Sequence, residues 1–343
     1  MTAGATAAGP AALPDATPGP LLAVEDLHVR FHTGGRVVHA VTGLSWSVEA
    51  GRTIAVIGES GSGKTASSRA VMGLLPPTAQ VTGSIRLQGQ ELVGLPPARM
   101  RQHRGRDLAM IFQDPARSLN PIMRVGPQIA EAIRSHERIS RKQARRRVVD
   151  LLGTVRLSAP EQRYDEYPHQ LSGGMRQRVM IAMALACRPR LLIADEATTA
   201  LDVTTQAQVM NMLMDLQREL GMAVVVISHD LGLAASYADQ VVVMYAGRAV
   251  ERAPRRELFH HVRMPYTQAL LSAVPRIDGA SHSLLPIVPG RPPDLSRPLE
   301  GCPFAPRCPR AGERCVREAP PFETTDHDHA YACWHPCADG EGQ

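Results

Sequence analysis

Apolar positions along the chain follow two different periods. Alternating apolar and polar residues over 22–31 and 37–48 predict two strands joined by a turn near Gly34 and Gly35. Further along, short apolar runs alternate with stretches of helical period. The expected strands are 53–57, 85–87, 108–112, 191–194, 223–227 and 240–245, and the expected helices are 64–75, 175–187, 204–220 and 231–238. This alternation predicts an α/β fold with a mainly parallel sheet.

Three segments interrupt this pattern. Residues 1–20 are mostly Ala, Gly, Pro and Thr, which is typical of a disordered tail. Residues 115–170 place apolar positions among many charges at helical spacing, so we predict a helical insertion with an exposed polar face. After about residue 252 the chain becomes irregular, and 286–321 is rich in proline. We therefore expect three parts: a tail over 1–20, a main domain over 21–252 and an appended module over 253–343.

Composition limits the possible classes of protein. Hydrophobic residues make up 44% of the 343 residues and charged residues 21%, as in an ordinary soluble globular protein. The longest apolar runs fall far short of the ~18–20 residues that a membrane-spanning helix needs, and no secretory signal is expected. The net charge of +5 is modest for this length, so a solvated basic surface is favoured over nucleic-acid binding.

A glycine-rich segment follows the apolar run 53–57 and precedes a predicted helix. It reads Gly58-Glu59-Ser60-Gly61-Ser62-Gly63-Lys64-Thr65 and fits the phosphate-loop pattern G-x-x-x-x-G-K-[ST]. In such a loop backbone N–H groups and the helix N-terminus face phosphate oxygens. Lys64 would reach the β- and γ-phosphates, and the Thr65 hydroxyl would ligate Mg²⁺. Lys64 is one of two lysines among 38 basic residues, and its compact ammonium suits this loop better than a guanidinium.

Two acidic residues end a second apolar run. Asp195 and Glu196 follow Leu191-Leu192-Ile193-Ala194 directly. Two carboxylates at the end of a buried strand are costly unless they serve a cation or a proton. Asp195 suits a Mg²⁺ shell, and Glu196 suits a general base that polarises the attacking water.

Downstream segments resemble the motifs of ATP-binding-cassette (ABC) ATPases, in the family's order. Leu171-Ser172-Gly173-Gly174-Met175-Arg176-Gln177 resembles the signature motif. Gln113 looks like the Q-loop glutamine, Asp202 like the D-loop aspartate and His229 like the switch histidine. Phe31 stands where the family often places an aromatic that stacks on adenine, although an aromatic near a strand end is more often part of the core.

The resemblance implies a P-loop ABC-type ATPase fold, in which a RecA-like core sheet carries an antiparallel β subdomain and a helical subdomain over about 115–170. It implies that Gln113 joins the Mg²⁺ shell and senses the nucleotide, and that His229 contacts the γ-phosphate. It also implies head-to-tail pairing with a second ATPase domain, an identical or a sister chain, so that ATP lies between the Lys64 loop of one and the Ser172 loop of the other. Two permease subunits and, indirectly, an external solute-binding protein complete such an importer, and the chain would lie on the cytoplasmic face of the membrane.

The last part of the chain concentrates cysteine. The segments Pro265-Tyr266-Thr267-Gln268-Ala269-Leu270-Leu271 and Gly301-Cys302-Pro303-Phe304-Ala305-Pro306-Arg307-Cys308 resemble the oligopeptide/dipeptide-importer branch of the family. In that branch four cysteines hold an iron–sulfur cluster, which implies Cys302, Cys308, Cys315 and Cys333 here. The C-x5-C-x6-C-x17-C spacing alone leaves a [4Fe–4S] cluster, a Zn²⁺ site and an unmetallated thiol cluster open.

Other charged residues surround these cysteines. Nearby arginines could offset thiolate charge, and three histidines are possible substitute ligands that we expect to be solvated. The arginines are Arg307, Arg310, Arg314 and Arg317, and the histidines are His327, His329 and His335. Cys337 lies outside the matched pattern.

The leading functional prediction is the ATP-hydrolysing subunit of a membrane importer for di- or oligopeptides. An importer of nickel or another small solute is an alternative within the family. A non-transport ATPase acting on DNA or ribosomes is a second class, but its members usually carry two cassettes, long coiled coils or large inserted domains. A redox-sensing protein in which the cysteine module is primary is a third.

Overall fold

The computed structural model describes residues 19–114, 118–198, 201–273, 288–297, 299–325 and 327–338. Most of the predicted 1–20 tail, the start of the predicted helical insertion at 115–117 and part of the proline-rich segment therefore lie outside the described residues. A search of the described helices finds none whose length and hydropathy would let it traverse a bilayer.

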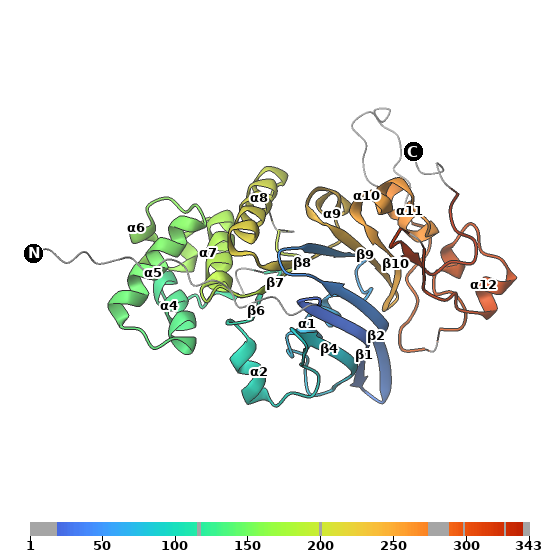
Figure 1. Ribbon diagram of the computed structural model, residues 1–343, viewed down its shortest axis with the longest axis horizontal. Helices are drawn as coiled ribbons and strands as arrows, with labels where there is room; N and C mark the ends of the chain where they lie inside the picture. The colour runs from blue at the N-terminus through green and yellow to red at the C-terminus, as the bar shows by residue number, and fades with distance from the viewer. Residues whose placement is uncertain are drawn as a thin grey trace, which may run out of the picture.

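The described residues form a large mixed sheet at the centre of the molecule (Figure 1). Its strand order is β11-β12-β10-β9-β3-β8-β7-β6. The strands are β3 (Thr53–Ile57), β6 (Leu108–Ile111), β7 (Leu191–Asp195), β8 (Ala223–Ser228), β9 (Gln240–Tyr245), β10 (Arg248–Pro254), β11 (Glu323–Thr324) and β12 (Ala330–Tyr331). Strands β6, β7, β8, β3 and β9 pair in parallel, which confirms the parallel core. β10, β12 and β11 extend it with antiparallel pairs.

A second, antiparallel sheet has the order β2-β1-β4-β5. Its strands are β1 (Leu22–Thr33), β2 (Arg36–Val48), β4 (Ala79–Leu87) and β5 (Gln90–Glu91). Gly34 and Gly35 form the β1–β2 turn with φ of 56° and 76°, a backbone region that favours glycine. The predicted strand pair and its turn are therefore confirmed.

The described residues also form α-helices. They are α1 (Lys64–Val71), α2 (Pro97–His103), α4 (Val125–His136), α5 (Arg141–Thr154), α6 (Pro160–Tyr164), α7 (Gly173–Leu185), α8 (Val203–Leu220), α9 (Leu231–Tyr237), α10 (Arg255–His260), α11 (Pro265–Ser272) and α12 (Glu313–Arg317). In Figure 1, α4 to α7 gather at one end of the molecule and the C-terminal residues at the other. Helix α1 ends before the predicted residue 75, because Gly73 takes a left-handed conformation with φ of 59°.

The two faces of the main sheet bury different cores. In β7, Leu192 and Ala194 belong to a core with helices α4, α5, α7 and α8. The alternate residues Leu191 and Ile193 belong to a core shared with the antiparallel sheet and α1. The alternation follows from the period of two along a strand. It leaves β7 buried on both faces, so that Asp195 at its end lies inside the molecule.

The C-terminal residues complete a third core. Tyr245 of β9, Tyr266 of α11 and Phe304 are packed ring against ring, with centroids 4.6–5.3 Å apart. Tyr266 and Phe304 are almost fully buried. Strand β12 pairs with β10, with Ala330 opposite Arg252. The C-terminal segment is therefore packed against the edge of the main sheet.

Candidate functional site

The glycine-rich loop joins β3 to α1 at the carboxyl end of the parallel sheet. All three of its glycines have positive φ values, 151° at Gly58, 80° at Gly61 and 100° at Gly63. A Cβ on Gly58 would collide with the carbonyl oxygen of Met244, and one on Gly63 with that of Ala40. The loop thus lies against neighbouring backbone, which only glycine permits at these positions.

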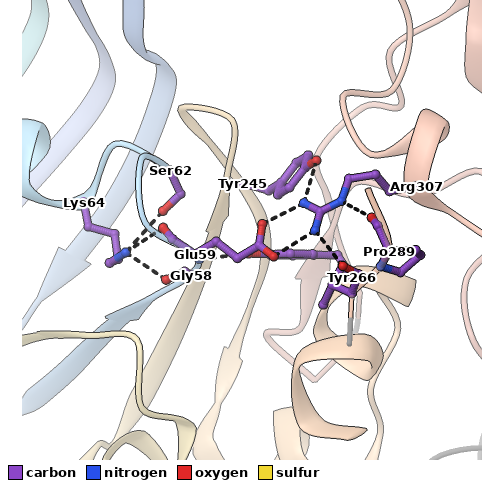
Figure 2. A network of polar contacts seen from close by, with 9 residues as sticks. Gly58, Glu59, Ser62, Lys64, Tyr245, Tyr266, Pro289 and Arg307 are labelled. Carbon is purple, nitrogen blue, oxygen red and sulfur yellow. Dashed lines mark hydrogen bonds and ion pairs between the residues drawn. The ribbon is translucent and has the colours of Figure 1, made fainter. Parts of the chain in front are cut away.

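Lys64 lies in the centre of this loop. Its Nζ donates hydrogen bonds of 2.8 Å to the carbonyl oxygens of both Gly58 and Glu59 (Figure 2). The residue is only 4% exposed, and burial lowers the pKa of its ammonium, although nearby carboxylates oppose the shift. The ammonium is thus held inside the loop by hydrogen bonds to two carbonyl oxygens. Phosphate oxygens of a bound nucleotide can replace these carbonyl oxygens as its hydrogen-bond acceptors.

Thr65 and Asp195 meet beside the loop, as their predicted roles require. The Thr65 hydroxyl donates to the Asp195 carboxylate at 3.3 Å. Burial raises the pKa of Asp195, while the hydrogen bond from Thr65 lowers it. Among the described residues no group of three His, Cys, Asp or Glu side chains is placed to hold a metal ion. Mg²⁺ commonly takes only one or two protein ligands beside phosphate and water oxygens, so the Thr65–Asp195 pair suits it.

Two predicted residues from different parts of the chain, Gln113 and His229, lie against Glu196. Gln113 Nε2 donates to Glu196 Oε2 at 2.7 Å, and His229 Nδ1 lies 3.6 Å from Glu196 Oε1. Glu196 has φ of 48°, unusual for a residue other than glycine, and its backbone N–H donates to Ile227 O. Strained backbone of this kind concentrates at functional sites. The carboxylate is thereby fixed one residue beyond Asp195.

The signature segment lies at the start of α7, among the helices at one end of the molecule. Ser172 caps this helix, because its hydroxyl accepts the backbone N–H of Met175. Asp202 caps α8 in the same way, accepting from Thr205. A Cβ on Gly174 would lie 3.2 Å from the Thr205 methyl group, so the two helix starts are neighbours.

The remaining signature positions are Leu171, Gly173 and Gln177. Leu171 is buried in the core beneath α7. Gly173 begins the helix, and a Cβ there would meet nothing within 4 Å, so its surface is open. Gln177 is 1% exposed, and its Nε2 has no hydrogen-bond partner among the described residues.

Phe31 lies on β1, opposite Val38 of β2 and Ala79 of β4. Its side chain is half-buried and packs against the core between the two sheets. Its contact with adenine stays a prediction.

The four matched cysteines lie close enough to influence one another electrostatically. Burial raises the pKa of Cys302 and Cys308, and that of Cys333 to about 12, and neighbouring thiols add to each shift. Each of these sulfurs also accepts a backbone N–H from two residues further on, namely Phe304, Arg310 and His335. Cys315 is buried beside them. No disulfide joins any of the six cysteines.

The surroundings of the cysteines differ in part from the prediction. His329 was expected to be solvated, but this is wrong: it is buried, and its Nε2 lies 2.8 Å from Glu251 Oε1. His327 and His335 are exposed as expected. Arg314 stacks on Trp334 and Arg317 pairs with Glu313, whereas Arg310 lowers the pKa of Cys308 by its charge.

Arg307 and Tyr266 are the contacts that sequence reasoning missed. Arg307 forms a bidentate ion pair with the Glu59 carboxylate of the phosphate loop (Figure 2). The Tyr266 hydroxyl accepts a hydrogen bond from the Glu59 backbone N–H. The positive charge of Arg307 was assigned to the thiolates. Only its place in the branch-specific segment could have marked it as special.

Sequence comparisons agree with this geometry. The family "ABC transporter" matches residues 41–199, and the family "Oligopeptide/dipeptide transporter, C-terminal region" matches residues 250–315. The oligopeptide transport ATP-binding protein OppD of Haemophilus influenzae is 48% identical over 92% of this chain and 97% of its own length. The dipeptide transport ATP-binding protein DppD of Bacillus subtilis is 48% identical over 92% of this chain and 94% of its own length.

Other relatives are longer. The OppD proteins of Mycobacterium bovis and Mycobacterium tuberculosis are 51% identical over 92% of this chain, which covers only 52% of their length. The chain therefore spans about half of these two mycobacterial relatives.

Solved structures show the same architecture. A dimeric ATP-binding cassette, MJ0796, in a post-hydrolysis state bound to ADP and Pi, superposes with a TM-score of 0.62 at 26% identity. The match covers 68% of this chain and 99% of that one. The cassette prediction for the fold is thus confirmed, apart from the cysteine-rich segment.

Proposed function

Because this chain belongs to the ABC transporter family of ATP-binding proteins, we propose that it hydrolyses ATP to drive a membrane importer of di- or oligopeptides. One observation carries the ATPase part of the proposal. The phosphate loop, the Thr65–Asp195 pair and Glu196 converge at the carboxyl ends of β3 and β7. The identity to OppD and DppD proteins supports peptides as the transported class.

The proposed roles follow from position. The loop from Gly58 to Thr65 binds the phosphates, and Thr65, Gln113 and Asp195 hold Mg²⁺. Glu196 accepts a proton from the attacking water, and His229 beside it contacts the γ-phosphate. The carboxylate of Glu196 accepts a hydrogen bond from Gln113. A movement of Gln113 in the Mg²⁺ shell would therefore also change the position of the Glu196 carboxylate.

A second ATPase domain would complete the site. The open helix start at Ser172 and Gly173 offers backbone N–H groups to an anion, and Asp202 lies beside it. We propose that this surface covers ATP held by the phosphate loop of the partner, an identical or a sister chain. The similarity to a dimeric cassette supports this arrangement.

The membrane partners would be two permease subunits, supplied with solute by an external binding protein. Such a complex would place this chain at the cytoplasmic face of the membrane. ATP binding would close the ATPase pair, and hydrolysis would reopen it.

The experiment that tests this function is reconstitution with candidate peptide permeases in lipid vesicles. The expected result is MgATP hydrolysis that rises when peptide and its binding protein are supplied, with uptake of labelled peptide. Turnover that responds to nucleic acid and not to permeases would overturn the transport proposal while leaving the ATPase proposal standing.

We further propose that Cys302, Cys308, Cys315 and Cys333 hold a [4Fe–4S] cluster. Three of these thiols accept backbone N–H groups. Burial, and to a smaller extent the neighbouring thiols, raises the pKa of Cys302, Cys308 and Cys333, so thiolates here need added positive charge. Among the described residues no group of three His, Cys, Asp or Glu side chains is placed to hold a metal ion, so the proposal rests on the four cysteines and on the resemblance of their segment. When bound, the cluster would supply a redox-active iron centre.

Anaerobic purification with iron, acid-labile sulfide and zinc analysis tests this assignment. About four irons and four sulfides per chain are expected for such a cluster, and Cys302→Ser should lose them. Cys187→Ser is the matched control, because this thiol lies elsewhere and donates to Ala132 O. Colourless protein with one zinc per chain would contradict the proposal.

A further inference from the structure

Arg307 lies at the junction between the C-terminal segment and the phosphate loop and forms hydrogen bonds through all three of its guanidinium nitrogens. Its Nε donates to Pro289 O at 2.6 Å, and its two terminal nitrogens contact Tyr245, Val288 and both carboxylate oxygens of Glu59 (Figure 2). The side chain is 4% exposed. A guanidinium offers five donors in a fixed plane, and here all three nitrogens are used. The position and orientation of the Arg307 guanidinium are therefore fixed by its hydrogen bonds.

Glu59 is held just as tightly from the opposite side. Its backbone N–H donates to the Tyr266 hydroxyl at 2.9 Å, and its carbonyl oxygen accepts from Lys64 Nζ at 2.8 Å. Its carboxylate accepts from Arg307 at 2.7 and 2.9 Å. Arg307 and Lys64 thus contact the same loop residue, one through its side chain and the other through its carbonyl group. A displacement of Glu59 would move an oxygen that holds Lys64.

The charge of Glu59 adds a second effect. Its carboxylate lies within electrostatic reach of the Lys64 ammonium. Without a partner it would therefore also lie near the triphosphate that Lys64 is proposed to bind, and it would repel that ligand in a partly buried site. Arg307 neutralises this carboxylate and turns it toward the C-terminal segment.

We propose that Arg307 is a positioning residue for ATP binding: through its ion pair with Glu59 it holds the phosphate loop of its own chain in shape and neutralises its acidic side chain. The inference rests on the proposed ATP site. It goes beyond it, because it assigns the C-terminal segment a direct part in nucleotide affinity. Tyr266 supports the same loop residue through its hydroxyl.

The test is a double-mutant cycle on MgATP affinity in the full-length protein. Arg307→Gln is expected to raise the Kd for MgATP about tenfold or more, since it leaves the carboxylate without its charged partner. Glu59→Gln removes the carboxylate charge, and its Kd for MgATP is the reference against which the double variant is compared. In the Glu59→Gln background, Arg307→Gln should change the Kd by less than about threefold, because the two residues act as one pair.

Arg314→Gln is the matched control, because Arg314 lies in the same segment but is exposed and pairs with Glu318. Its Kd for MgATP should equal that of the parent protein. Arg307→Lys keeps the positive charge but cannot form the bidentate pair with the carboxylate. Its Kd for MgATP should therefore lie between those of the parent protein and Arg307→Gln. If Arg307→Gln fails to fold, Arg307→Lys, with and without Glu59→Gln, carries the same comparison.

Two results would overturn the inference. The first is an unchanged Kd in Arg307→Gln or, where only the lysine variant folds, in Arg307→Lys. The second is an equal loss of affinity with and without Glu59→Gln, which would show that Arg307 acts through general folding. Failure of the parent protein to bind MgATP would instead contradict the proposed function. The parent protein is measured first, so this outcome is distinguished from failure of the inference.

Discussion

At the residue scale, the site combines contacts that sequence reasoning can reach with contacts that it cannot. The meeting of Thr65 with Asp195 is predictable, because both follow strands of one parallel sheet and the carboxyl ends of such strands share an edge. The pairing of Glu59 with Arg307 is not. The two residues are 248 positions apart, and no period or motif indicates which arginine turns toward the loop.

Glu196→Gln should retain MgATP binding and lose hydrolysis by at least about 100-fold, because the amide cannot accept the proton of the attacking water. The Gln113 contact can persist, since an amide oxygen also accepts a hydrogen bond. Phosphate release measured beside nucleotide binding checks this. Glu161→Gln, at an exposed glutamate, is the control. Turnover at the parental rate would show that Glu196 is not the base.

Asp195→Asn should stabilise the nucleotide-free protein while weakening MgATP hydrolysis. Burial raises the pKa of Asp195, so its ionised form costs folding free energy at pH values above that pKa. The gain in Tm from the amide should therefore be present at pH 7, and it should shrink as the pH falls and the native carboxyl becomes protonated. Thermal unfolding without Mg²⁺ at several pH values measures it.

Asp202→Asn provides the contrast for this experiment. Hydrogen bonds from Thr205 lower the pKa of Asp202, so its ionised form is favoured in the folded protein. The amide should not raise the Tm at pH 7. A higher Tm in both variants would mean that general charge repulsion, rather than burial of Asp195, explains the gain.

At the element scale, hydrophobic period locates the helices and strands, while caps and backbone turns set their ends. Helix α7 begins at Gly173, before the predicted residue 175, because Ser172 caps it. Short elements such as β12 were missed because two residues carry no readable period. The pairing partner β10 lies far from β12 in the chain and supplies the hydrogen bonds that define this strand.

Two serine caps allow local stability to be separated from function. Ser172→Ala and Ser140→Ala each remove a side chain that accepts a backbone N–H at a helix start. Each should cost about 1 kcal/mol of unfolding free energy. Only Ser172→Ala should also lower ATP hydrolysis in the assembled transporter, since only this serine lies in the signature segment. Urea unfolding and ATPase rates check the pair, and equal rates in both variants would contradict the role of Ser172.

At the scale of the whole molecule, the C-terminal segment is continuous with the main sheet and its core. Composition predicted an appended module, because proline-rich sequence lacks a helix or strand period. Three rings from distant segments nevertheless pack together, and β12 extends the sheet through β10. Tertiary packing of this kind depends on shape and is not visible in any single window of sequence.

Phe304→Ala should therefore lower the stability of the entire chain. Phe304 is 1% exposed, and such a truncation typically costs about 3–5 kcal/mol. Val316→Ala, at a residue that is 63% exposed in the same segment, should change it by less than about 0.5 kcal/mol. Urea unfolding followed at several wavelengths is the measurement. An early, separate transition that alone responds to Phe304→Ala would show that the segment unfolds independently.

The position of Arg307 between Cys302 and Cys308 has a thermodynamic consequence. Coupling between two binding events is reciprocal: if one ligand changes the affinity for a second by some factor, the second changes the affinity for the first equally. If a group bound by the thiols shifted Arg307, it would change the affinity for ATP, because Arg307 contacts Glu59 of the phosphate loop. By the same factor, ATP would alter how firmly the cysteines keep that group. Occupancy of the thiol site and occupancy of the nucleotide site would then favour or oppose each other to the same extent.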